Sequence, residues 1–224
     1  MKSLKKALLG LAVTAIGAIA MSQPVAAMTM TVTDMKYANP TTASIHSTST
    51  NLNVKAGEFV VTDGTKTFLA WCVDIFQLTT FNQAVKDYKV GVPAGVSRNT
   101  VDMLALLATE ALSQVVGSET SGAFQLAAWE IVNENSDKYN LDTGNFKADH
   151  VSGGAKAIAQ NWLTNLPTAS AYSVTWYASA SKQDLAVFEK LPATVPEPAT
   201  MALLGLGLLG FAGSRRKQAG RSKA

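Results

Sequence analysis

Apolar and polar residues alternate along the part of the chain that follows residue 27. Residues 28–63 are rich in Thr, Ser and Val, and turn signals such as Asn39-Pro40 and Asp63-Gly64 interrupt the alternation. This pattern predicts the strands of a β-meander. The next segment, Thr67–Ile75, is aromatic, β-branched and almost continuously apolar. We therefore expect it to form a strand that lies centrally in a sheet.

The middle of the chain has the apolar repeat of helices. A first stripe predicts a helix that is capped by Ser97 or Asn99, reaches about residue 116 and is stopped by Gly117. A second helix, capped by Ser118 or Ser121, is expected to reach about residue 135. Its predicted apolar face consists of Phe124, Ala127, Ala128, Ile131 and Val132.

A third helix, predicted over residues 154–165, precedes a return to strands at 172–178 and 185–189. Strands on both sides of a helical insert predict an α+β fold in which β-sheet is the larger share. Residues 28–194 suit one well-buried core, so we expect a single β-sheet-rich domain there.

The first 27 residues have the composition of a secretory signal peptide. Lys2, Lys5 and Lys6 precede an apolar run over residues 7–21, and small residues end the segment at Ala27. A membrane-spanning helix needs about 20 apolar residues, and this run is shorter. We therefore expect a signal peptidase to cut after Ala27 and the rest of the chain to be exported.

Residues 195–217 combine three features in a fixed order. They are a Pro-Glu-Pro motif (Pro196, Glu197 and Pro198), a short apolar segment over residues 199–213, and a basic cluster (Arg215, Arg216 and Lys217). Basic clusters beside a membrane helix stay in the cytoplasm, so the domain that precedes this segment is expected outside the inner membrane. A plain single-span anchor is the alternative interpretation.

This order of features closely resembles the PEP-CTERM sorting signal of Gram-negative bacteria. The resemblance implies a short transmembrane helix that holds the chain transiently in the inner membrane, with residues 218–224 as a basic tail. It also implies an exosortase as partner, cleavage near residues 195–200, and delivery to the cell surface or an extracellular matrix.

The net charge of the whole chain, +3, comes from its two ends. Residues 28–195 hold 11 Lys and Arg against 15 Asp and Glu, so the exported domain is mildly acidic. No basic stripe with interleaved aromatic residues is present. This argues against nucleic acid as a partner.

Two short segments carry candidate chemistry. They are WCVDIF at residues 71–76, which contains the single cysteine of the chain, and FQLAAWEI at residues 124–131. Together they resemble the bacterial thioester domain, which has a bulky residue before a cysteine, often Asp two residues later, and a downstream Gln-x-Ala-x-Trp helix. The positions that match this pattern are Trp71, Cys72, Asp74, Gln125, Ala127 and Trp129.

The resemblance implies an internal thioester between Cys72 and Gln125, through which an adhesin-like protein attaches covalently to amines on a partner. Trp71, Asp74 and Trp129 would support it. On an ideal helix Trp129 lies one turn after Gln125 and would shield the bond from water. Asp74 is expected on the same strand face as Cys72, where it would orient a group or bind the backbone. Such a bond reacts once per molecule, so we expect neither enzymatic turnover nor a cofactor.

Other interpretations of the exported domain remain open at this stage. The main alternative is a non-covalent protein of the extracellular matrix or biofilm that has a structural or polysaccharide-binding role. A cysteine hydrolase would need a histidine to activate Cys72. The two histidines, His46 and His150, lie in loop-like surroundings with no signature that links them to Cys72. Two histidines and one cysteine so widely scattered also predict no metal site.

Overall fold

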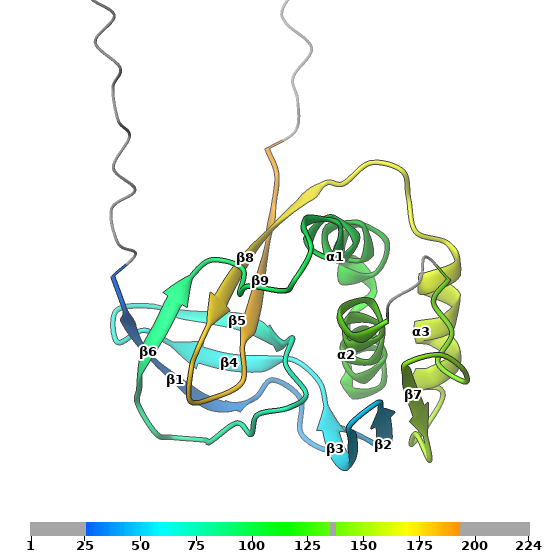
Figure 1. Cartoon of the computed structure of the whole chain (residues 1–224), viewed down its shortest axis with the longest axis horizontal. Coiled ribbons are helices and arrows are strands. Elements are labelled where there is room, and N and C mark those ends of the chain that lie inside the picture. Colours follow the sequence, from blue (N-terminus) through cyan, green and yellow to red (C-terminus); the bar gives the residue numbers. More distant parts are fainter. Residues whose placement is uncertain (1–25, 135–137, 193–224) are drawn as a thin grey trace, which may run out of the picture.

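The computed structural model describes residues 26–134 and 138–192 (Figure 1). The predicted signal peptide, apart from its last two residues, and the predicted sorting signal at 195–217 lie outside these ranges. Among the helices that the structure does describe, none is long and apolar enough to cross a membrane. Between the two ends, the described chain is a β-rich α+β structure, as the sequence predicts.

Six strands close into a barrel in the order β1-β4-β5-β9-β8-β6, drawn on the left of Figure 1. They are β1 (Met28–Met35), β4 (Phe59–Thr62), β5 (Thr67–Cys72), β6 (Val85–Val90), β8 (Tyr172–Ala178) and β9 (Leu185–Lys190). Neighbouring strands pair antiparallel. The strand predicted over Thr67–Ile75 does lie between two neighbours, β4 and β9, but it ends at Cys72.

Three further strands form a separate sheet in the order β3-β2-β7: β2 (Thr41–Ser47), β3 (Thr50–Ala56) and β7 (Phe146–Asp149). The prediction of a simple meander over residues 28–63 is therefore wrong, although its strands exist. The β2-β3 hairpin leaves the barrel, and β1 pairs with β4 instead. The hairpin does so because one face of β2, with Thr41, Ala43 and Ile45, is buried in the core.

Three helices lie to one side of the barrel: α1 (Arg98–Ala111), α2 (Ser118–Asn133) and α3 (Ala155–Thr164). The Ser97 side chain caps α1 and accepts a hydrogen bond from the Thr100 N–H at 3.1 Å. The first helix is shorter than predicted, because the chain tightens into a 3₁₀ turn over Leu112–Gln114. Gly117, rather than Ser118 or Ser121, is the N-cap residue of α2.

Helix α2 occupies the middle of the molecule, between the barrel and α3 with the small sheet (Figure 1). Every residue from Ser121 to Ile131 is buried. The predicted one-sided apolar stripe on this helix was therefore too narrow. Small residues such as Ala123 and Ala127 let neighbouring elements approach from several sides, so polar Gln125 and Glu130 are buried as well.

The two strands that the sequence did not predict, β6 and β7, are short, and half of the residues in each are charged. Their partners in the sheets stabilise them. Three barrel strands, β5, β8 and β9, and the helices α2 and α3 begin and end within about three residues of the predicted limits. Helix α1 agrees with its prediction only at its start.

Gly122 allows the closest approach between α2 and the small sheet. A Cβ atom at this position would lie 2.1 Å from Thr41 Oγ1, far inside contact distance. Thr41 is itself fixed, because its hydroxyl donates a hydrogen bond to the Ser118 carbonyl at 3.1 Å. A side chain at position 122 therefore has no room unless β2 moves away from α2.

We predict that Gly122→Ala destabilises the fold through this clash, by about 1–3 kcal/mol as in other overpacked cores. For a domain of this size that loss lowers the melting temperature by roughly 2–4 °C per kcal/mol. Gly117→Ala is the matched control, because a Cβ atom there meets open space. Urea denaturation compares the two variants, and equal losses would contradict the close approach.

Candidate functional site

The structure brings Cys72 and Gln125 into direct contact. Cys72 is the last residue of β5, and Gln125 lies in the middle of α2. The Cys72 N–H donates to Gln125 Oε1 at 3.2 Å, and Gln125 Nε2 donates to the Cys72 carbonyl at 2.7 Å. Both residues are 1% exposed. The side-chain amide of Gln125 thus lies against the residue that carries the thiol.

The end of a buried strand explains why a glutamine is needed here. Pairing between β4 and β5 ends at Phe59 with Ala70, two residues before Cys72. The Cys72 N–H and carbonyl therefore have no partner from β4, and buried backbone groups need one. A carboxamide offers one acceptor and one donor in a plane, like a peptide group, and Gln125 supplies both.

The Cys72 thiol is enclosed and protonated. Its Sγ donates to the Asp74 carbonyl at 2.9 Å. Burial, with a smaller contribution from the Asp74 and Asp184 carboxylates, raises the pKa of the thiol to about 12, although the Trp129 indole and the Asp74 backbone lower it in part. At neutral pH this cysteine is therefore a neutral thiol that solvent does not reach.

Trp129 lies one helical turn after Gln125 and is 3% exposed. Its indole nitrogen is buried and makes no well-formed hydrogen bond in the part of the chain that the structure describes. The indole N–H nevertheless lies close enough to the Cys72 thiol to lower its pKa. The fold therefore holds a hydrogen-bond donor beside the sulfur.

Asp74 and Trp71 have structural contacts. The strand ends before Asp74, so its carboxylate does not share a strand face with Cys72, contrary to that prediction. Instead, Asp74 Oδ1 accepts from the Phe76 N–H at 2.7 Å, which leaves backbone binding as its role. The Trp71 ring packs on Phe124 of α2 with centroids 4.3 Å apart. It helps to hold α2 against β5.

Asp184 is a neighbour of the thiol that sequence reasoning missed. Its main-chain carbonyl accepts from the Val73 N–H at 3.0 Å. Its carboxylate accepts from Trp176 Nε1 at 3.0 Å and from the Ser179 N–H at 2.8 Å. Burial raises the pKa of this carboxyl. No local sequence signal distinguishes Asp184, because its position depends on the pairing of β5 with β9.

The two histidines are not partners of Cys72. His46, predicted in a loop, lies in β2, where its ring contacts Asn51 and Asp149. His150 follows β7 at the end of the small sheet. In residues 26–134 and 138–192, no three His, Cys, Asp or Glu side chains gather as metal ligands would.

The comparisons with known proteins bear mainly on the C-terminus. Residues 194–217 match the PEP-CTERM protein-sorting motif. This confirms the sorting signal predicted at 195–217 and marks the chain as an exported, exosortase-processed protein that is sorted to the cell surface or extracellular space. No curated protein sequence matches the chain.

One solved structure that is similar is the N-terminal thioester domain of a surface protein from Clostridium perfringens, in a cysteine-to-alanine mutant. The match covers 67% of this chain and 99% of that one, with 12% sequence identity and a TM-score of 0.40.

A second buried polar group, Glu130, follows Trp129 on α2. Glu130 Oε1 accepts from the Asn140 N–H at 2.6 Å, while Oε2 is buried and has no hydrogen-bond partner among the residues that the structure describes. Burial raises the pKa of this carboxyl from 4.5 to about 7, and the nearby charge of Glu134 adds to the shift. Below about pH 7, the folded protein therefore holds the Glu130 carboxyl mainly in its neutral form.

We predict that this carboxyl makes stability fall as pH rises. Between about pH 4.5 and about pH 7 the folded state keeps a proton that the unfolded chain has lost, so unfolding becomes easier through that window. Glu130→Gln keeps the shape and removes the titration. Relative to this variant, the wild-type free energy of unfolding should fall by on the order of 1–2 kcal/mol from about pH 4.5 to about pH 8. Urea denaturation at the two pH values measures it, and parallel pH profiles would refute the assignment.

Proposed function

We propose that this exported protein forms an internal thioester between Cys72 Sγ and Gln125 Cδ and uses it to attach covalently to an amine-bearing target at a cell surface or in a matrix. The observation that carries the proposal is the pair of hydrogen bonds, 3.2 and 2.7 Å long, that hold the Gln125 carboxamide on the main chain of Cys72. They hold the Gln125 carboxamide against the residue that carries the only thiol in the sequence.

Formation of the bond exchanges a thiol for an amide nitrogen. The sulfur of Cys72 attacks Cδ of Gln125, so the Sγ–Cδ bond forms and the Cδ–Nε2 bond breaks. The thiol proton goes to the departing nitrogen, which leaves as ammonia. An amide is a poor electrophile, but groups held in position can reach effective molarities of about 10⁵ M or more.

The hydrogen bonds between Cys72 and Gln125 suit this reaction. The Cys72 N–H already donates to Oε1, the oxygen that gains negative charge when the carbon is attacked. Donors that are fixed at such an oxygen stabilise the transition state. The Trp129 N–H, which lies beside the sulfur, would stabilise negative charge that develops there when the proton leaves. Both donors come from elements that the core holds rigidly.

Transfer to a target reverses the roles of the two groups. A target amine attacks Cδ, forms a new amide bond and breaks the Cδ–Sγ bond, while its proton passes to the sulfur and restores the thiol. The link is permanent and forms once per molecule, so the protein is not an enzyme and needs no cofactor.

Access to the bond requires movement of the loop that follows Cys72. The loop over residues 73–84 exposes large apolar side chains at Phe76 (61%), Leu78 (74%) and Phe81 (45%). The same loop holds the Asp74 carbonyl that accepts from the thiol. A target that contacts these side chains would displace the loop and admit its amine.

We predict that the purified protein lacks the mass of one ammonia. Cys72→Ala and Gln125→Ala should both restore the full sequence mass, and methylamine should add to the wild type alone. The matched control is Gln160→Ala, because Gln160 also binds two backbone groups, the Leu141 N–H and the Tyr139 carbonyl, each at 3.0 Å. That variant should still lack ammonia. Intact mass spectrometry measures these masses, and a wild-type protein of full sequence mass would contradict the proposal.

We predict a separate effect for Trp129→Phe, which keeps a ring but removes the indole N–H. Loss of one hydrogen bond to a developing charge is worth about 1.5–3 kcal/mol, so the ammonia loss after refolding should slow by about tenfold or more. Trp162→Phe is the control, since its indole N–H donates to Gln114 Oε1 at 3.3 Å. Mass measured over time after refolding gives the rates. Equal rates in the two variants would leave Trp129 with only a packing role.

A further inference from the structure

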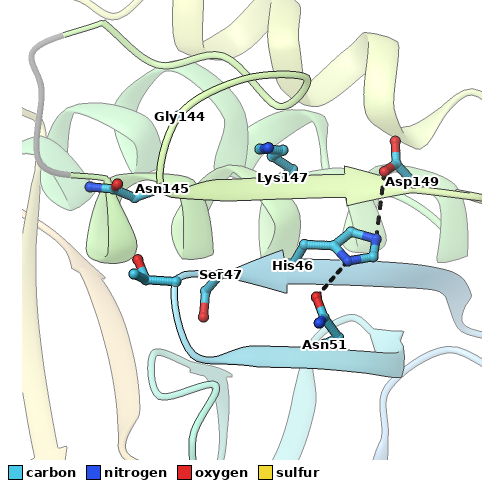
Figure 2. Close-up of a pocket in the computed structure, with 8 residues that line it drawn as sticks. His46, Ser47, Asn51, Gly144, Asn145, Lys147 and Asp149 are labelled. Atoms are coloured by element: carbon cyan, nitrogen blue, oxygen red, sulfur yellow. Dashed lines mark hydrogen bonds and ion pairs between the residues drawn. The ribbon is translucent and has the colours of Figure 1, made fainter.

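The small sheet has one face that the described chain leaves uncovered. Residues at one set of alternating positions are buried against the core, among them Ala43, Ile45 and Ala148. The opposite positions of all three strands are polar: Thr42, Ser44 and His46 of β2, Asn51, Asn53 and Lys55 of β3, and Lys147 and Asp149 of β7. In Figure 2 the helices lie behind this sheet, and four of these side chains, His46, Asn51, Lys147 and Asp149, stand in front of them.

Hydrogen bonds across the strands hold these side chains in a fixed arrangement. His46 lies between Asn51 and Asp149, with its Nδ1 2.7 Å from Asn51 Oδ1 and its Nε2 3.5 Å from Asp149 Oδ2 (Figure 2). One register step along, the Ser44 hydroxyl donates to Asn53 Oδ1 at 2.7 Å. The oxygen of each asparagine side chain is thereby occupied by β2, and its NH₂ group is left to face a ligand.

Asn51 and Asn53 are unfavourable residues for the strand positions that they occupy. Asparagine is among the residues that strands disfavour, and Asn51 and Asn53 both occupy the interior of the exposed strand β3. Within the described residues neither side-chain amide nitrogen donates a hydrogen bond. Successive outward positions of a strand are about 6.8 Å apart. The two free NH₂ groups therefore form an evenly spaced row of donors.

The face is hollowed along its length. One hollow of about 510 Å³ is lined by His46, Asn51, Asn145, Lys147 and neighbouring residues, and a second of about 430 Å³ is lined by Ser44, Asn53, Lys55 and neighbouring residues. No Phe, Tyr or Trp of the described residues lines either hollow. A ligand that fits must be extended and must bind through many hydrogen bonds.

The charges select the ligand further. Asp149 contacts Lys156, whose Nζ lies 3.5 Å from Asp149 Oδ1 and 2.6 Å from Asp142 Oδ1. Lys147 and Lys55 have no ion pair within the described residues. The face thus combines two unpaired cations with free amide donors, while its one carboxylate already contacts a lysine.

We propose that this face, made by β3, β2 and β7, binds an extended acidic polysaccharide. Carboxylates of the sugar chain pair with Lys147 and Lys55, and its hydroxyl and ring oxygens accept from the side-chain amides of Asn51 and Asn53. The contacts are exposed and lack an aromatic platform, so each sugar is held weakly, and binding depends on salt and on several contacts along the chain. This site is separate from the Cys72–Gln125 pair and does not depend on it.

The test uses the full-length chain in detergent, with sodium polygalacturonate as the acidic probe and dextran as the neutral one. Affinity electrophoresis should show retention by polygalacturonate that weakens as salt increases, and none by dextran. Lys147→Gln should weaken the retention about two- to fivefold, as expected for an exposed ion pair, and the double variant Asn51→Ala/Lys147→Gln should weaken it further. Lys89→Gln, which removes an exposed lysine from the barrel strand β6, should change nothing.

Cys72→Ala should bind polygalacturonate as the wild type does, which separates this proposal from the thioester. Circular dichroism confirms that each variant is folded. The proposal is overturned if the wild type shows no retention, if dextran retains it equally, if Lys89→Gln loses as much as Lys147→Gln, or if Cys72→Ala abolishes binding.

Discussion

The arrangement of this protein depends on how one buried strand end is satisfied. Strand β5 ends inside the core at Cys72, where β4 no longer pairs with it, and the side chain of Gln125 takes over as the hydrogen-bonding partner. That requirement brings α2 directly against the barrel. The helix is then covered by the small sheet on another side, which explains its continuous burial and the need for glycine at position 122.

A glutamine that binds two backbone groups is not by itself reactive. Gln160 makes the same type of contact with the chain at Tyr139 and Leu141, where no thiol is present. At Gln125 the bound backbone belongs to Cys72, and the indole N–H of Trp129 lies beside the sulfur without a well-formed bond. A purely structural contact explains why Gln125 binds the backbone of Cys72. It does not explain why the fold places the Trp129 indole N–H at the thiol.

Local patterns in the sequence predicted the strands and helices that local periodicity defines. They did not predict the features that depend on pairing between segments far apart in the sequence. The strands at 172–178 and 185–189 and the helix after residue 154 are long and periodic enough to be recognised, whereas β7, with four residues, is stabilised by β2. Barrel closure, and with it Asp184 beside the thiol, follows from pairings between segments far apart in sequence. The contact of Cys72 with Gln125, 53 residues away, was expected from the family resemblance, since no periodicity links the two.

The central claim is that the contact between Cys72 of β5 and Gln125 of α2 becomes a covalent bond. A crystal structure of the purified protein at high resolution tests this claim most directly. The account predicts continuous electron density between Cys72 Sγ and Gln125 Cδ, with no nitrogen remaining on that carbon. Separate density for a free thiol and an intact carboxamide that still donates to the Cys72 carbonyl would contradict it.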